Sequence, residues 1–100
     1  MASTVQYDQF FLSYSGARLP LNMVGGLPAD EIANRNTFFG VCIDDQQRTV
    51  LIHKVLYGEL ELQHRYGYHD NGALAWAEIL DDEGEQRLLQ FDGQGQLIAG

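Results

Sequence analysis

Apolar and polar residues alternate along much of the chain, and this pattern predicts a protein built mainly from β-strands. In residues 9–16 (QFFLSYSG) two sets of side chains alternate until Gly16, with Phe10, Leu12 and Tyr14 in one set and Phe11, Ser13 and Ser15 in the other. A period of two residues is typical of a strand with one dry face and one wet face. Residues 19–24 (LPLNMV) predict a second extended segment, which Pro20 favours at a sheet edge and which Gly25 and Gly26 are expected to end.

One short helix is predicted at residues 28–35, between the second and third extended segments. Pro28 suits the first helical position, and Asp30 and Glu31 suit the positive end of the helix dipole. Because two helical turns are marginally stable in isolation, we expect Ile32 to dock on the sheet.

The second half of the chain predicts a meander of hairpins. Residues 37–43 are rich in β-branched and aromatic side chains, and turn-forming residues follow them at 44–47. A two-residue hairpin turn at Tyr57 and Gly58 would place Lys54 opposite Glu61 as a cross-strand ion pair. The same turn would pair Leu56 with Glu59, Val55 with Leu60 and His53 with Leu62.

The next turn sets the register of the following strand pair. A three-residue loop at 70–72, with glycine in the left-handed bulge position, would pair Tyr68 with Leu74, Tyr66 with Trp76 and His64 with Glu78. A shift by one residue would put Asp81 on the apolar face, so we prefer the first register. We therefore predict an α+β fold in a single domain over residues 1–100, namely an antiparallel β meander of five to seven strands with one short helix at about 28–35.

The turns also suggest an internal repeat. Residues 91–97 (FDGQGQL) align with 68–74 (YHDNGAL) at a spacing of 23, and residues 43–50 form an approximate third copy with one extra residue and no glycine. This unit resembles MORN-type and YD-type β-hairpin repeats, which implies a structural β unit of a kind that often mediates contacts. Separately, FLSYSG at 11–16, LPL at 19–21 and NRNTFF at 34–39 resemble a family of small bacterial proteins of unknown function. That resemblance implies no site residues.

Charge narrows the classes of partner. The net charge is −8, and residues 44–100 contribute −7 of it with four basic and eleven acidic side chains. Such a field repels phosphate backbones, so we expect no binding to nucleic acid. No stretch approaches the roughly 20 apolar residues of a membrane-spanning helix, and the single cysteine excludes an internal disulfide. We expect a cytoplasmic protein.

One constellation could carry chemistry. In the predicted register His53 and His64 lie on one face near Glu78, where they could line a pocket for acid–base work. The alternative is two histidines at the sheet margin, one of them paired with Glu78. Metal binding needs at least three convergent ligands, and His69 has the opposite parity, so we expect no metal and no cofactor. The acidic residues at 81–85 lack the spacing of a calcium loop.

Two further features have competing interpretations. Tyr66, Tyr68 and Trp76 share one predicted sheet face, which is either the core beneath the helix or a partly exposed contact face. Cys42 lies between Val41 and Ile43, and this apolar setting predicts an inert thiol.

These patterns predict a non-enzymatic module with a structural or protein-interaction role, contacting an unidentified protein partner through a sheet edge or the aromatic face. The alternative function is a small-molecule-binding or weakly enzymatic domain, with His53, His64 and Glu78 lining its pocket.

Overall fold

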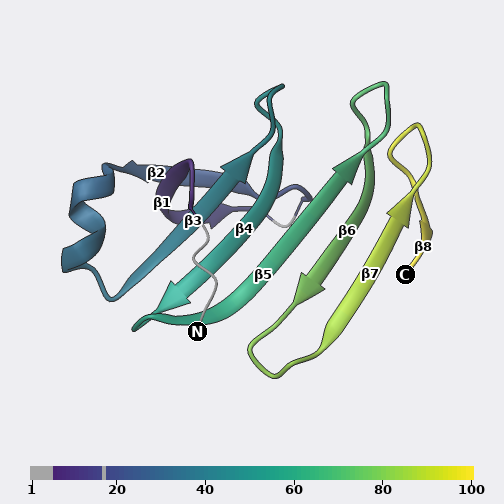
Figure 1. Ribbon diagram of the computed structural model, residues 1–100. Coiled ribbons are helices and arrows are strands. Elements are labelled where there is room, and N and C mark those ends of the chain that lie inside the picture. The colour runs from purple at the N-terminus through teal and green to yellow at the C-terminus, as the bar shows by residue number, and fades with distance from the viewer. Residues whose placement is uncertain (1–5, 17) are drawn as a thin grey trace.

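A single antiparallel sheet of eight strands dominates the computed structural model, which describes residues 6–16 and 18–100 (Figure 1). The strand order is β2-β1-β3-β4-β5-β6-β7-β8. The strands are β1 (Gln9–Ser15), β2 (Asn22–Leu27), β3 (Thr37–Ile43), β4 (Thr49–Leu56), β5 (Glu59–Tyr68), β6 (Leu74–Leu80), β7 (Gln86–Phe91) and β8 (Leu97–Ala99). The predicted antiparallel sheet is confirmed, but the predicted number of five to seven strands is too low.

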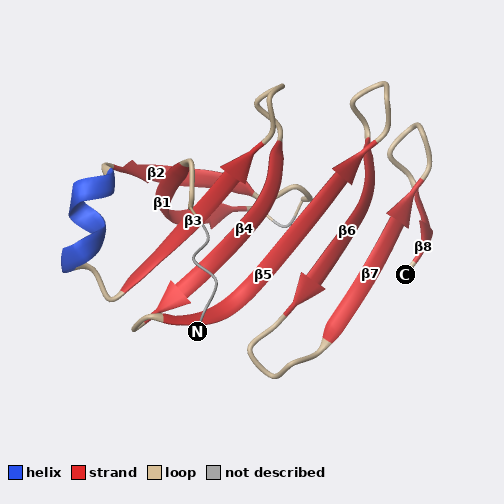
Figure 2. Cartoon of the chain, viewed as in Figure 1, coloured by secondary structure: helices blue, strands red, loops and turns tan. Residues whose placement is uncertain are grey.

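The helix is a short 3-10 helix, η1 (Ala29–Asn34), in the position that the sequence predicts (Figure 2). Its backbone bonds span three residues, as in the bond from the Glu31 N–H to the Pro28 carbonyl at 3.0 Å. It has no buried residue and lies at one end of the sheet beside β1, so it covers neither face. Ile32, which the sequence predicts to dock on the sheet, is half-buried, and η1 contacts β1. Within the described ranges no helix has the length and apolarity needed to cross a membrane.

The hydrophobic core lies on one face of the sheet, which we call the core face. Its buried residues are Phe39, Val41, Ile52, Tyr66 and Ala77 from β3 to β6, together with Leu21 from the connection between β1 and β2. Half-buried Phe11, Leu19 and Met23 pack against them, so β1, β2 and their connection fold over this face. We call the opposite side the outer face. It carries His53, Gln63, Arg65, Trp76 and Glu78.

Two β-bulges displace the predicted registers. In the β4–β5 hairpin the pairs Leu56–Glu59 and Val55–Leu60 are confirmed, but a bulge at Lys54/Val55 then pairs His53 with Gln63 and Lys54 with Leu62. In β5–β6 the pair Tyr68–Leu74 is confirmed, but a bulge at Gly67/Tyr68 pairs Tyr66 with Ala77 and His64 with Ile79. Because neighbouring residues point to opposite faces, a shift of one residue separates His53 from Leu62 and His64 from Glu78. Lys54 and Glu61 still form the predicted ion pair.

The expected break at Gly25 and Gly26 is also wrong, because both residues lie inside β2. Gly25 has a φ of +75°, and a Cβ at this position would lie 2.9 Å from the Leu12 Cβ. Gly25 therefore lets an irregular edge strand approach β1 closely. Its place at the edge of the sheet agrees with the interpretation of Pro20.

Four turns share one hydrogen-bond pattern. In each, the first N–H donates to the fifth carbonyl and the fourth N–H donates to the first carbonyl; the turns are at residues 44–48, 69–73, 81–85 and 92–96. The fourth residue has a positive φ in every case, being Gln47, Gly72, Gly84 and Gly95. The turn at 44–48 therefore has the same length as the others, and the extra residue expected in this copy does not exist.

Candidate functional site

The structure does not assemble the pocket predicted from His53, His64 and Glu78. His53 points to the outer face, whereas His64 is paired with Ile52 and Ile79 on the core face. Glu78 is paired with Arg65 on the outer face, opposite the side of His64. The predicted His64–Glu78 pair is therefore wrong, and its failure follows from the bulge at Gly67/Tyr68.

His53 joins the start of the described chain to β5. Its Nδ1 lies 2.7 Å from the Tyr7 hydroxyl, and its Nε2 lies 2.8 Å from Oε1 of Gln63. Because the Gln63 oxygen only accepts, Nε2 carries the proton and Nδ1 accepts from Tyr7. Both ring nitrogens are thus satisfied within the fold, and burial raises the pKa of the Tyr7 hydroxyl. The Tyr7 ring lies over Gly40, where a Cβ would come within 2.5 Å of it.

His64 belongs to a second buried network, on the core face. Its Nδ1 lies 2.7 Å from the Tyr66 hydroxyl, which also accepts the Leu21 N–H at 3.3 Å. The hydroxyl proton is therefore available to the imidazole, which favours neutral His64 with its proton on Nε2. Burial lowers the pKa of His64, so the rise that a Glu78 partner would cause does not occur.

Glu78 makes contacts of its own on the outer face. Its Oε1 lies 3.7 Å from Nη1 of Arg65, and its Oε2 accepts a hydrogen bond from Nε2 of Gln86 at 2.8 Å. The Glu78 carboxylate therefore contacts Arg65 and Gln86 rather than a histidine.

The predicted aromatic contact face is divided between the two sides of the sheet. Tyr66 is only 3% exposed and belongs to the core, where burial raises the pKa of its hydroxyl. Tyr68 donates to the Thr49 carbonyl, and Arg48 lies 4.8 Å above its ring. Trp76 lies on the outer face over Gly67, where a Cβ would overlap the indole. The core interpretation thus holds for Tyr66, although no helix lies above it.

Cys42 and the acidic turn at 81–85 both form hydrogen bonds to the backbone of the fold. Cys42 is half-buried, its Sγ donates to the Gln6 carbonyl at 3.5 Å, and burial raises the pKa of the thiol. Oδ1 of Asp81 accepts the N–H groups of Glu83 and Glu85, so this carboxylate closes its own turn. Among the described residues, no group of three or more His, Cys, Asp or Glu side chains is arranged to hold a metal.

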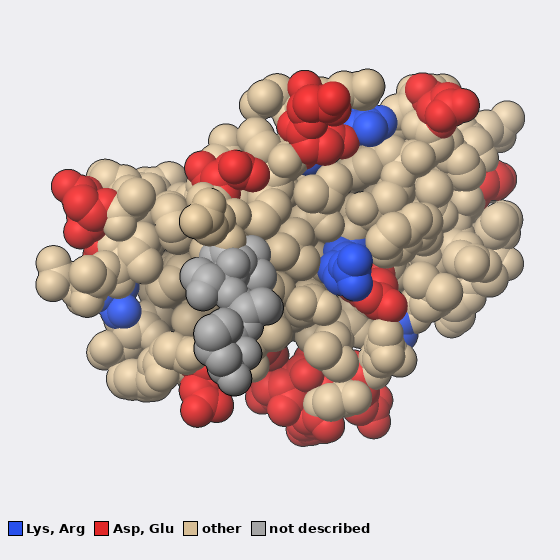
Figure 3. Space-filling model, in the orientation of Figure 1, with Lys and Arg blue, Asp and Glu red and all other residues tan. Residues whose placement is uncertain are grey.

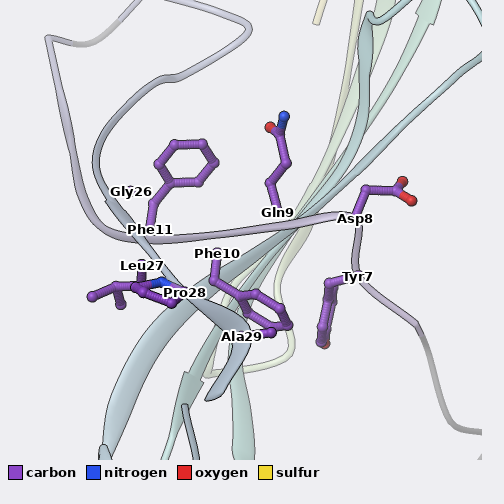
Figure 4. A pocket seen from close by; sticks show the side chains of 9 residues that line it. All are labelled: Tyr7, Asp8, Gln9, Phe10, Phe11, Gly26, Leu27, Pro28 and Ala29. Carbon is purple, nitrogen blue, oxygen red and sulfur yellow. The ribbon is translucent and has the colours of Figure 1, made fainter. Parts of the chain in front are cut away.

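A hollow of about 570 Å³, which we call the β1 hollow, lies between residues 7–11 and residues 26–29 (Figure 4). The Tyr7 and Phe10 rings lie on one side of β1 and Phe11 on the other. Tyr7, Phe10 and Phe38 meet edge to face, with ring centroids 5.7–6.4 Å apart. The Asp8 carboxylate forms a hydrogen bond to the sheet, in which its Oδ2 accepts the Ile43 N–H at 2.9 Å. Sequence reasoning missed this site, although the aromatic residues in YDQFF at 7–11 were a signal for it.

A smaller hollow of about 370 Å³ lies beside the tip of the β4–β5 hairpin, and we call it the tip hollow. Its lining residues are Leu56, Tyr57, Glu59, Leu60, Glu61 and Asp82. The side chains of Tyr57 and Leu60 are 72% and 47% exposed. Figure 3 shows acidic side chains gathered along the lower margin, where the β4–β5 and β6–β7 turns lie in Figure 1. Sequence reasoning treated this turn only as a hairpin signal.

These features define a β-sheet protein in which the predicted site residues lie within strands β4, β5 and β6 and contact other parts of the fold. The chain belongs to a family of unknown function, DUF6156, whose model matches residues 3–100. This match does not confirm the resemblance to MORN-type or YD-type repeats. Neither the curated proteins nor the solved structures contain a match to the chain.

Proposed function

We propose that this chain is a non-enzymatic protein-interaction module. The observation that carries the proposal is the exposure of large hydrophobic side chains on a sheet whose faces no helix covers within residues 6–16 and 18–100. Eight of them are between 38% and 72% exposed in the described part of the chain: Leu12, Tyr14, Val24, Tyr57, Leu60, Leu88, Leu97 and Ile98. Among the described residues, six hydrophobic side chains form the buried core. The exposed residues lie on β1 and β2, at the tip of the β4–β5 hairpin, and on β7 and β8. Exposed apolar patches are typical of protein contact sites.

The shape of the molecule supports the same function. The radius of gyration is 14.0 Å, whereas a compact domain of this length has a value of about 13 Å. The sheet is thus wider than its buried core, whose strand residues come from β3 to β6. The buried histidines support a structural role for their surroundings, since their polar partners lie within the fold.

The exposed hydrophobic residues fall into three groups that a pull-down can separate. The tagged chain is used to capture proteins from its host lysate, alongside the variants Leu12→Ser/Val24→Ser, Tyr57→Asn/Leu60→Ser and Leu88→Ser/Leu97→Ser. Gln94→Ser serves as an exposed control. We expect one specific partner to be lost with one of the three variants and retained by the control. Capture that is the same for all variants, each shown to be folded by circular dichroism, would contradict an interaction through these surfaces.

A second candidate function is the binding of a small aromatic or aliphatic molecule in the β1 hollow, supported by the adjacent Tyr7 and Phe10 rings. Saturation-transfer NMR with a library of aromatic fragments tests it. Signals that vanish with Phe10→Ser support this function, and signals unaffected by the change contradict it. We further propose a reducing compartment such as the cytoplasm, because the chain has a single cysteine.

A further inference from the structure

We propose that the tip hollow binds an arginine side chain of a partner protein, with an apolar residue of the partner beside it. This inference rests on the proposed interaction function and specifies the chemistry of the contact. The occupant is a protein segment, because the hollow is shallow and open, and it combines apolar side chains with carboxylates.

The apolar part of the tip hollow suits the stem of a long side chain. Leu56 is half-buried, whereas Leu60 and Tyr57 present much of their surface to solvent. Aliphatic stems of Arg and Lys cover such surface while their charged ends stay hydrated. An adjacent leucine or valine of the partner would shield the rest of Leu60.

The acidic part of the tip hollow lacks matching positive charge. Lys54 neutralises Glu61, with Nζ 2.8 Å from the carboxylate oxygen. Glu59 and Asp82 have no ion pair within the described ranges, and both line the hollow. Two other basic residues lie near this end: Arg35 donates its Nε to the Thr37 carbonyl, and Arg87 is paired with Ile79. Neither of them lines the hollow. A cation from a partner therefore completes the hollow, in keeping with the net charge of −8.

Arginine fits this arrangement better than lysine. The guanidinium group is planar, it is weakly hydrated, and it both stacks on aromatic rings and pairs with carboxylates. The exposed Tyr57 lines the hollow together with the leucines and the carboxylates, and it lies on the turn that Tyr57 and Gly58 form. An ammonium group would pair with Glu59 or Asp82 but would gain less from the ring.

The test is a titration of the ¹⁵N-labelled chain with the peptide acetyl-Gly-Leu-Arg-Leu-Gly-amide, followed by amide NMR spectra. We expect chemical-shift changes confined to residues 56–61 and 82. The same peptide with citrulline in place of arginine keeps the shape but loses the charge, and it should bind at least about fivefold more weakly. The lysine version should also bind more weakly than the arginine version. Equal binding by the citrulline or the lysine version, shifts elsewhere or no shifts would each overturn the proposal.

Variants of the chain distinguish binding at the tip hollow from a general attraction of the cationic peptide to an acidic protein. Glu59→Gln/Asp82→Asn should weaken the arginine peptide roughly fivefold, the size expected for exposed ion pairs. The control Glu31→Gln/Asp70→Asn removes the same charge from exposed sites elsewhere and should leave affinity unchanged. Tyr57→Asn should also weaken binding, and it should keep the turn because asparagine tolerates the positive φ of +50° at this position. Equal weakening by the control pair overturns the proposal.

Failure here is distinguishable from failure of the interaction function. If the peptide does not bind but the lysate partner is lost with Leu88→Ser/Leu97→Ser or Leu12→Ser/Val24→Ser, the module has another contact surface. If neither assay gives a specific result, both proposals fail.

Discussion

At the scale of single residues, two glycines make room for aromatic rings on the outer face. The Trp76 indole lies over Gly67, and the Tyr7 ring lies over Gly40. We expect Gly67→Ala to lower the free energy of unfolding by about 1–3 kcal/mol, because the added methyl group must displace the indole or bend β5. Urea denaturation measures the change.

Gly26 provides the matched control for this substitution. It also lies in a strand, but a Cβ there meets no atom within 4 Å and its φ is not in the left-handed region. Gly26→Ala should be neutral or slightly stabilising, since it also reduces the freedom of the unfolded chain. Equal losses at both positions would show that the ring contact does not matter.

The imidazole of His64 gives a prediction about pH. Burial lowers its pKa in the folded chain below the ordinary histidine value, so the unfolded chain binds this proton more readily. Stability should be complete above the ordinary value, fall as the pH drops through it, and level off below the folded pKa. NMR titration of the imidazole and urea unfolding across this range measure both effects. A His64 pKa above that of free histidine would refute the neutral Tyr66–His64 network.

At the scale of elements, the turn at 44–48 has glutamine at the position where its three counterparts have glycine. Gln47 has a φ of +66°, whereas Gly72, Gly84 and Gly95 occupy the same position in the other turns. A residue with a side chain pays roughly 1 kcal/mol for this conformation. Gln47→Gly should therefore raise the free energy of unfolding by up to about 1 kcal/mol, as measured by thermal or urea denaturation.

The neighbouring Gln46 serves as the control because it is exposed in the same turn without a positive φ. Gln46→Gly should give no gain, or a small loss from the extra freedom of the unfolded chain. A gain from both changes would mean that glycine stabilises the turn for some reason other than backbone conformation.

The elements also explain what could be predicted from the sequence. Glycine marked the turns at 70–72, 83–84 and 92–95. The predicted pairs closest to the turns at 57–58 and 70–72 were correct. The ion pair between Lys54 and Glu61 was also correct, at 2.8 Å. Turn chemistry is local, so a sequence can reveal it.

The errors arose a few residues further from each turn. The bulge at Gly67/Tyr68 lies where the Trp76 ring crosses Gly67, a contact between strands that no local pattern encodes. The bulge at Lys54/Val55 had no glycine to mark it. Because one extra residue exchanges the two faces of a strand, a small local error separated His53 from His64 and removed the predicted pocket.

At the scale of the whole molecule, the small core implies an uneven distribution of stability. Val41 and Ile52 are 1% and 0% exposed, and they lie in β3 and β4. At the other end of the sheet, β8 has only three residues and pairs with β7 alone, and its Leu97 and Ile98 side chains are largely exposed. Local opening follows burial and the number of neighbours, so β8 should open far more readily than β4.

Amide hydrogen exchange tests this distribution. We expect the slowest exchange in β3, β4 and β5 and the fastest strand exchange in β8, with η1 also fast because it has no buried residue. The tip hollow is formed at the end of the β4–β5 hairpin, so the strands that present it should belong to the most protected part of the sheet. A site on such a framework binds without ordering its backbone first, which reduces the entropic cost of association. Exchange in β4 as fast as in β8 would contradict this order of stability and would remove the rigid support on which the proposed arginine contact depends.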